Sequence, residues 1–119
     1  MTVVLVGLFG GLGAVVRYLA EYAVRARHPR DRPWATVAVN ALGCGVAAFV
    51  GYRFAGALDA HLRDVAVTGF CGGLTTFSSA FAVPAVLQRE HHWGYSAALL
   101  VSTPLACLVL YQLGMLLAR

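Results

Sequence analysis

Charged side chains are scarce in this chain of 119 residues. They make up 12% of the sequence, and only five of them are acidic. The five carboxylates lie between or at the ends of apolar runs, and none of the four histidines lies inside one. Catalysis by paired carboxylates, by a nucleophile with its base, or by a metal requires such groups to converge. The sequence therefore argues against an enzyme.

Long apolar runs take the place of the missing charges. The chain is 60% hydrophobic and has a mean hydropathy of +0.73. A water-soluble protein of this composition would expose too much apolar surface. Each run has about 20 residues, the length that crosses about 30 Å of hydrocarbon. We predict an all-α integral membrane protein with one domain, residues 1–119, and four transmembrane helices at roughly 2–24, 34–54, 65–88 and 93–118. A cleavable signal peptide is not expected, because the first run is full length and further spans follow.

The basic residues follow a membrane pattern. Residues 25–33 combine two prolines with four arginines, so a membrane helix should not continue through them. We interpret this loop as an interface anchor in a lipid bilayer, which also explains the formal charge of +4 without a nucleic-acid partner. Five arginines lie in the loops opposite the termini and three on the terminal side, which favours termini outside the cell. The difference is small, so insertion in both orientations stays open.

The third run contains a polar stretch that a membrane helix should not tolerate. Gly72 and Gly73 loosen the backbone at mid-span. Four hydroxyls follow within five positions: Thr75, Thr76, Ser78 and Ser79. Backbone groups freed at this depth need partners inside the protein or in a wet cavity. The stretch therefore predicts a broken helix with an ion or substrate site. A second interpretation stays open, in which Gly69 and Gly73 form a helix-packing G-x-x-x-G pair.

Two pairs of residues four apart are candidates for this site, because such residues share a helix face. Thr36 and Asn40 are the first pair. Asn40 is either interhelical glue or an uncharged donor to an anion. Phe77 and Phe81 are the second pair, and their rings are either plain apolar contacts or present positive edges to an anion.

Arg17 lies within the first run, where a charge is costly and is usually paired or functional. It could pair with Glu21 one turn later, but we favour a position facing protein or a water-filled vestibule. In the fourth run, Thr103 and Cys107 are four apart and could continue a polar track. The three cysteines form no C-x-x-C and imply no disulfide. The adjacent histidines at 91–92 lack metal-ligand spacing.

Four short helices cannot easily enclose a pore and still pack against each other. The small-residue faces of the first two spans, rich in glycine and alanine, call for a partner. We expect a dimer with the broken segment near its interface.

Three motifs in order resemble the Fluc (CrcB) family of small fluoride channels. They are GGLGA at 10–14 with Arg17 and Tyr18, then Thr36-x-x-x-Asn40-x-x-Gly43, then GFCGGLTTFS at 69–78. The resemblance covers nearly the full chain. It implies an antiparallel dimer of four-helix subunits, with two fluoride pathways. It also implies passive fluoride efflux through the cell (plasma) membrane, and hence fluoride resistance.

The resemblance further implies roles for individual residues. A structural sodium ion would be held at the dimer centre by the backbone carbonyls of Gly72 and Thr75 from both subunits. Asn40 would be the pore asparagine, Phe77 the first pore phenylalanine, and Arg17 the vestibule arginine. The remaining candidates for the polar pathway are Thr36, Thr76, Ser78, Ser79, Phe81 and Thr103.

The chain departs from the family pattern at three points. Members of the family commonly have two phenylalanines three apart, whereas here Ala80 takes the second position and Phe81 comes one residue late, turned by about 100° around the helix. Ala82 and Val83 replace a usual glutamate, and Leu99 stands where span four usually carries an aromatic. These losses and the arginine bias favour one half of a heteromeric pair, a homologous second subunit supplying the other, over a homodimer.

The alternative function is a small multidrug-type proton-coupled transporter, which shares the four spans and the dual-topology dimer. Such a transporter needs a membrane-embedded carboxylate in span one. Glu21 is the only candidate and lies near the helix end. A purely structural, partner-stabilising subunit is a further alternative.

Overall fold

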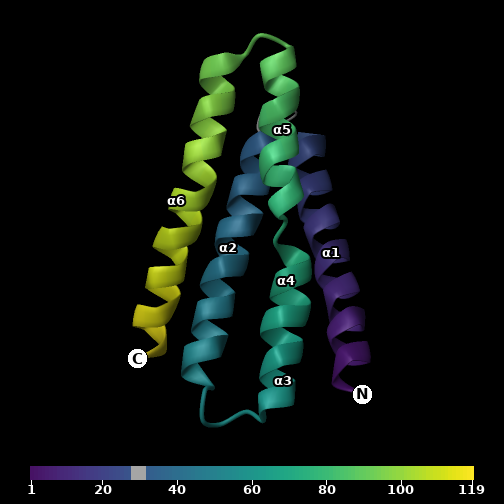
Figure 1. Ribbon diagram of the computed structural model, residues 1–119, viewed down its shortest axis with the longest axis vertical. Coiled ribbons are helices and arrows are strands. Elements are labelled where there is room, and N and C mark those ends of the chain that lie inside the picture. The colour runs from purple at the N-terminus through teal and green to yellow at the C-terminus, as the bar shows by residue number, and fades with distance from the viewer. Residues whose placement is uncertain (28–31) are drawn as a thin grey trace.

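The computed structural model describes residues 1–27 and 32–119. It consists of helices connected by short turns (Figure 1). The elements in order are α1 (Thr2–Arg27), α2 (Arg32–Arg53), α3 (Ala60–Asp64), η2 (Val65–Cys71), α4 (Gly72–Leu74), α5 (Phe77–Arg89) and α6 (Trp93–Ala118). The predicted all-α class is confirmed for the described residues. Within the predicted anchor loop, residues 28–31 lie outside them.

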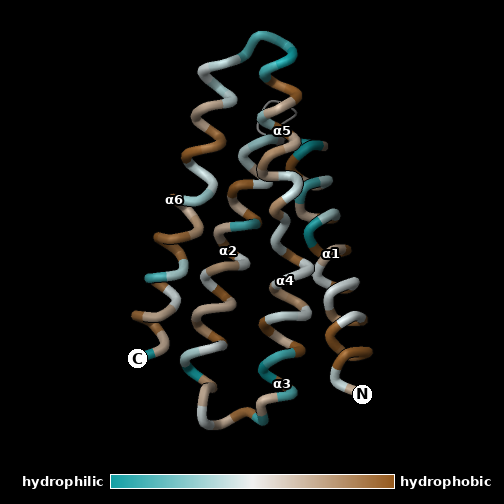
Figure 2. The backbone as a smooth tube through the Cα atoms, in the orientation of Figure 1, coloured by the Kyte–Doolittle hydropathy of each residue, from teal (hydrophilic) through white to brown (hydrophobic). Residues whose placement is uncertain are grey.

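Four helical stretches in the described part of the chain are long and apolar enough to cross a membrane. They are Thr2–Arg27, Pro33–Arg53, Ala60–Arg89 and Trp93–Ala118. The first extends three residues past the expected end at 24, and the third begins five residues before the expected start at 65. Both termini lie at the same end of the bundle (Figure 1). Hydrophilic residues gather in α3 and in the turn between α5 and α6, at opposite ends of the bundle (Figure 2).

The third stretch is broken, as predicted, but the break is not at the two glycines. The backbone stays helical from Ala60 through Leu74, with a π-helical segment at Val65–Cys71. Gly72 itself has φ −63° and ψ −38°. The chain becomes extended at Thr75 (φ −84°, ψ 153°) and Thr76 (φ −144°, ψ 118°), and α5 then begins at Phe77. Threonine is β-branched and favours extended backbone, which explains why the break falls there.

The glycines instead allow α1 to lie against the third stretch. A Cβ atom on Gly73 would collide with the backbone of Gly10, and one on Gly13 would collide with the Phe70 carbonyl and, at 2.8 Å, the Leu74 nitrogen. A Cβ on Gly69 would lie 3.0 Å from the Val6 carbonyl. The helix-packing interpretation of the G-x-x-x-G pair is thus confirmed. The break and the helix-packing contact thus occur at neighbouring residues, while the ion or substrate site stays a prediction.

A second close contact joins α2 to α6, the most extensive helix pair in the bundle. A Cβ on Gly114 would collide with the Gly45 carbonyl. Ser96 of α6 is fully buried, and its hydroxyl donates to the Pro84 carbonyl of α5 at 2.9 Å.

The buried core is made mostly of small side chains, and most large apolar residues face outward. This is the arrangement expected when lipid or another subunit covers the helices.

Candidate functional site

Asn40 holds the broken backbone at one peptide unit. Its Oδ1 accepts the Thr76 N–H at 2.7 Å, and its Nδ2 donates to the Thr76 carbonyl at 3.1 Å. The side chain is only 4% exposed. In a continuous helix the Thr76 N–H would bond to the carbonyl of residue 72. Asn40 therefore replaces the helical bond that the Thr76 N–H loses at the break, which is the requirement for a break at membrane depth.

Thr76 also begins the next helix. It is the N-cap of α5, and its hydroxyl oxygen accepts the Ser79 N–H at 3.2 Å. The same hydroxyl lies 3.1 Å from the Ser78 hydroxyl and 3.3 Å from the Ser79 hydroxyl. Three of the four predicted hydroxyls thus form one connected group. An N-cap threonine of this kind stabilises a helix by about 1 kcal/mol.

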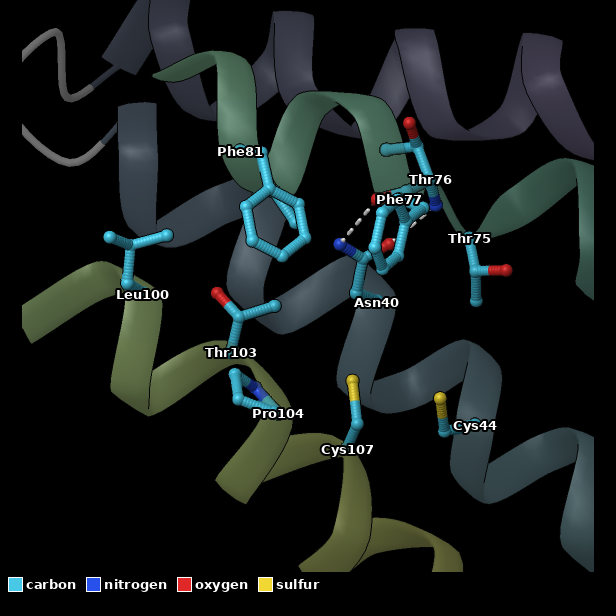
Figure 3. A pocket seen from close by; sticks show the side chains of 11 residues that line it. Asn40, Cys44, Thr75, Thr76, Phe77, Phe81, Leu100, Thr103, Pro104 and Cys107 are labelled. Carbon is cyan, nitrogen blue, oxygen red and sulfur yellow. Dashed lines mark hydrogen bonds between the residues drawn. The ribbon is translucent and has the colours of Figure 1, made fainter. Parts of the chain in front are cut away.

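A cavity of about 270 Å³ opens beside this group, between α2, α5 and α6 (Figure 3). Its walls are mostly apolar, and the polar lining groups come from a few threonines, two thiols and Asn40. The lining residues are Asn40, Cys44, Thr75, Thr76, Phe77, Ala80, Phe81, Leu100, Thr103, Pro104 and Cys107. The structure thus brings together five of the predicted pathway residues, far apart in the sequence: Asn40, Thr76, Phe77, Phe81 and Thr103.

The two phenyl rings lie side by side at this cavity. The Phe77 and Phe81 centroids are 4.6 Å apart, with the planes tilted by 45°. The predicted shared face is confirmed. Phe77 is 82% exposed in the single subunit, and Phe81 is 51% exposed. Despite its shifted position in the sequence, Phe81 still lines the cavity, as does Ala80.

Thr75, predicted for the sodium site, also lines this cavity, whereas the other predicted residues lie outside it. Thr36 and Ser79, together with Thr103, line a separate gap of only about 10 Å³, near the lower limit for one water molecule. Ser78 lines neither space and points toward the Thr76 hydroxyl. Gly72 is exposed on the outer face, with nothing within 4 Å of a Cβ built there.

Arg17 and Glu21 each hydrogen-bond to another segment of the chain. The Arg17 guanidinium donates to the Thr75 carbonyl at the break, at 3.3 Å. Glu21 accepts the Thr36 hydroxyl at 3.3 Å. The favoured prediction for Arg17, a position facing protein, is confirmed. The intrahelical pairing with Glu21 is not the arrangement seen.

Four lining residues were not predicted as part of the site: Cys44, Ala80, Leu100 and Pro104. Cys107 was expected only as a possible continuation of the polar track from Thr103. Cys44 is four residues after Asn40, and Cys107 is four after Thr103, so the helical period places each on the same face as a predicted residue. That spacing is a signal for both thiols. Leu100 carries no such signal. Leu99, noted for its missing aromatic, is instead 2% exposed and packed inside, and its carbonyl accepts the Thr103 hydroxyl at 2.8 Å.

The broken helix gives the site two electrostatic poles. A helix carries about half a positive charge at its N-terminus and half a negative charge at its C-terminus. The 13-residue α5 begins at the cavity, so its positive end faces the space beside Asn40. The preceding helical stretch ends at Leu74, so its carbonyls make the opposite pole around Thr75. Discontinuous helices of this kind bind anions and cations in transport proteins.

These features define a class: a multi-pass membrane protein with a broken third span, whose polar break opens into a cavity between helices. The family model for CrcB-like protein, Camphor Resistance (CrcB), matches residues 4–115. The chain belongs to the CrcB family.

Curated relatives match over nearly the whole chain. The Fluoride-specific ion channel FluC of Prosthecochloris aestuarii is 36% identical over 119 residues, covering 98% of this chain and 92% of the relative. The Fluoride-specific ion channel FluC of Magnetococcus marinus is 31% identical over 121 residues, covering 100% and 98%. The Fluoride-specific ion channel FluC 1 of Leifsonia xyli subsp. xyli is 37% identical over 118 residues, covering 97% and 83%.

Proposed function

We propose that this chain is a fluoride-selective channel subunit, which lets fluoride leave the cell passively through the plasma membrane and so lowers its cytoplasmic concentration. The observation that carries the proposal is the Asn40-bound break of the third span, with the N-terminus of α5 and two phenyl rings at one cavity. The relatives named as fluoride-specific channels support the choice of ion. A passive channel requires no reaction chemistry, and we assign the chain no enzymatic activity.

The chemistry of the cavity suits a small, strongly hydrated anion. Such an ion needs replacements for its water shell, yet it must be released on the far side. The Asn40 NH₂ has two hydrogens, and one of them is used by the Thr76 carbonyl. The second is available to an ion in the cavity. The tilted rings of Phe77 and Phe81 offer positive edges without adding a charge that would trap the ion.

We further propose that two subunits pair in antiparallel orientation. The cavity is open on one side, and Phe77 projects from the surface of the single subunit. A second subunit would cover both and complete the pathway. The departures from the family pattern favour a homologous second chain over an identical one. Size-exclusion chromatography with light scattering on the purified chain would give a dimer mass if one gene suffices, and a monomer mass would support the heteromeric arrangement.

A structural sodium ion at the dimer centre is part of the proposal. The carbonyl oxygens of Gly72 and Thr75 are hard ligands at the negative pole of the break. Each already receives one hydrogen bond, from the Thr75 hydroxyl at 3.4 Å and from Arg17 at 3.3 Å. A carbonyl has two lone pairs, so one remains on each. Two like charges 4 Å apart repel by about 4 kcal/mol at an effective dielectric of 20, so we expect Arg17 to weaken the site.

The sodium proposal has a direct test. Dimer melting temperature would be compared in sodium and in N-methylglucamine, for the parent chain and for Arg17→Gln. Sodium should raise the melting temperature of both, and more for Arg17→Gln. No difference between the two cations in either chain would refute a sodium ion at the interface.

Glu21 gives little support to the multidrug-type alternative. A proton-coupled transporter would place this carboxylate in its substrate cavity, but Glu21 lines a small hollow of about 50 Å³ with Tyr18, Tyr22 and Arg25. Its Oε1 is engaged by Thr36. We expect Glu21→Gln to leave fluoride efflux intact. Loss of drug resistance in cells carrying that variant would instead favour the transporter.

The function is tested with the purified chain in liposomes loaded with fluoride or with chloride, in sodium buffer. Asn40→Asp is the matched variant. We expect rapid efflux of fluoride alone from the parent chain and none from the variant. If the parent is silent, the assay is repeated with a co-expressed homologous subunit. Equal chloride efflux, or silence with every partner, would overturn the proposal.

A further inference from the structure

Two thiols lie in the wall of the same cavity. Cys44 comes from α2 and Cys107 from α6, and both are free thiols that line the same space as Asn40 and Thr103. In Figure 3 both sulfur atoms point toward the side of the cavity that holds Asn40. Nothing in the anion pathway proposed above uses either of them.

The third cysteine is placed differently. Cys71 is 4% exposed in η2 and is absent from the cavity lining. Its backbone carbonyl, not its thiol, serves the break by accepting the Thr75 N–H at 2.9 Å. The chain therefore contains an internal control: one buried thiol outside the cavity and two inside it.

Paired thiols in an apolar wall favour one class of ligand. Thiolates are soft ligands and select soft cations. Two thiolates neutralise a divalent cation, and a neutral complex avoids the cost of burying a charge. Among the described residues no group of three or more histidine, cysteine or acidic side chains could hold a metal. A four-coordinate zinc site is therefore not available here, whereas a linear two-coordinate cation needs no third ligand.

We propose that Cys44 and Cys107 form a two-thiolate site for a soft divalent cation of the Hg²⁺ type, and that an occupied site obstructs the cavity. On binding, two S–H bonds break, two S–Hg bonds form, and two protons pass to the buffer, with no change of oxidation state. Obstruction of fluoride rests on the proposed function, whereas metal binding does not. The site would make the subunit sensitive to thiophilic metals.

The binding test uses the purified full chain and Hg²⁺ alone. One equivalent of Hg²⁺ is added in a chloride-free buffer, and the remaining thiols are counted by maleimide labelling and intact mass. The count should fall from three to one. Glutathione is then titrated in to find the concentration that removes half the metal. The same titration is run on Cys44→Ser, Cys107→Ser and Cys71→Ser, because serine keeps the size of the side chain but binds Hg²⁺ poorly.

A bridging site makes a specific prediction for these variants. Joining two ligands in one site raises apparent affinity by about 10²–10⁴. Cys44→Ser and Cys107→Ser should therefore release the metal at about 10²–10⁴ lower glutathione, while Cys71→Ser should match the parent. The proposal would be overturned if all four chains released the metal at the same glutathione concentration. It would also be overturned if Cys71→Ser released the metal at a lower concentration than the parent. Matching elution volumes on size exclusion would show that each variant is folded.

A flux arm tests the obstruction separately. Hg²⁺ should stop fluoride efflux in the parent and in Cys71→Ser, each measured against its own rate before the metal is added. The blocked proteoliposomes are then diluted into a glutathione concentration that leaves the parent blocked. At that concentration, efflux through Cys44→Ser and Cys107→Ser should recover. Tight Hg²⁺ binding with unchanged fluoride efflux would refute the obstruction of the cavity but would still support the two-thiolate site. If the chain does not conduct, the thiol count still decides the binding.

Discussion

Asn40→Ala should free the Thr76 peptide at the helix break. In the parent chain the Asn40 side chain accepts the Thr76 N–H at 2.7 Å and donates to the Thr76 carbonyl at 3.1 Å. Alanine removes both contacts and adds no new partner. The Thr76 N–H should then open to water more often, and the first turn of α5 should lose its fixed position.

The size of the effect follows from the hydrogen bonds. A net hydrogen bond contributes about 1 kcal/mol, and leaving its buried partner unsatisfied costs about 1–3 kcal/mol. We take about 2 kcal/mol for the Thr76 N–H alone. Since about 1.4 kcal/mol is tenfold in an equilibrium, its hydrogen exchange should be roughly 30-fold faster.

Asn40→Asp separates the two roles of this residue. Aspartate keeps an oxygen for the Thr76 N–H but puts a second oxygen beside the Thr76 carbonyl. We therefore expect the amide to stay protected while fluoride efflux stops. A carboxylate about 5 Å from the ion, at an effective dielectric of 20, opposes it by about 3 kcal/mol, which is roughly 200-fold in rate.

Hydrogen exchange with mass spectrometry on a peptide covering residues 74–82 measures the protection, and liposome efflux measures conduction. If Asn40→Ala exchanges like the parent, Asn40 does not hold the break. If Asn40→Asp exposes the amide as much as alanine does, the loss of flux reflects a collapsed site and not charge in the pathway.

Two further comparisons use matched pairs. Phe77→Ile should reduce fluoride efflux by about tenfold if the aromatic geometry is worth about 1.5 kcal/mol. Phe81→Ile should reduce it less, because the Phe81 ring is less exposed. Equal, severe losses in the liposome assay would show that the two rings act as a unit. Gly73→Ala should lower the free energy of unfolding by about 1–3 kcal/mol, because its Cβ meets the Gly10 backbone. Gly11→Ala, with nothing within 4 Å, should change it by less than about 0.5 kcal/mol, and thermal melting in detergent compares the two.

The four spans and the presence of a break could be predicted from the sequence because both depend on local properties. Apolar runs of about 20 residues and a cluster of hydroxyls can be read without knowing what packs where. The position of the break could not be read in this way. Gly72 and Gly73 are flexible by themselves, but the approach of α1 is close at Gly73 and both glycines stay helical. The extended residues are the two threonines that follow.

The partners of the polar groups depend on tertiary contacts, and the sequence does not give these. Asn40 was predicted as glue or as an anion donor, and its contact with Thr76, 36 residues away, fulfils the first role. Its remaining N–H leaves the second as a prediction. Arg17 and Glu21 are one turn apart, a spacing that is compatible with an ion pair. In the structure, Arg17 instead donates to the Thr75 carbonyl and Glu21 accepts the Thr36 hydroxyl. The π-helical segment before the break had no recognisable signal in the composition of residues 65–71.

The polar groups at the break are already bonded to each other, and this bears on how an ion could pass. Among the described residues, no buried side-chain nitrogen or oxygen lacks a hydrogen-bond partner. Idle donors aimed into a dry cavity would bind a small anion tightly and hold it. Shared donors must give up part of an existing bond, so each contact with the ion is weaker. A pathway conducts only when binding is strong enough for entry and weak enough for exit. We expect the hydroxyls around Thr76 to meet both conditions, because each can shift from a protein partner to the ion and back. The remaining N–H of Asn40 has no protein partner to give up, so it would supply one stronger contact.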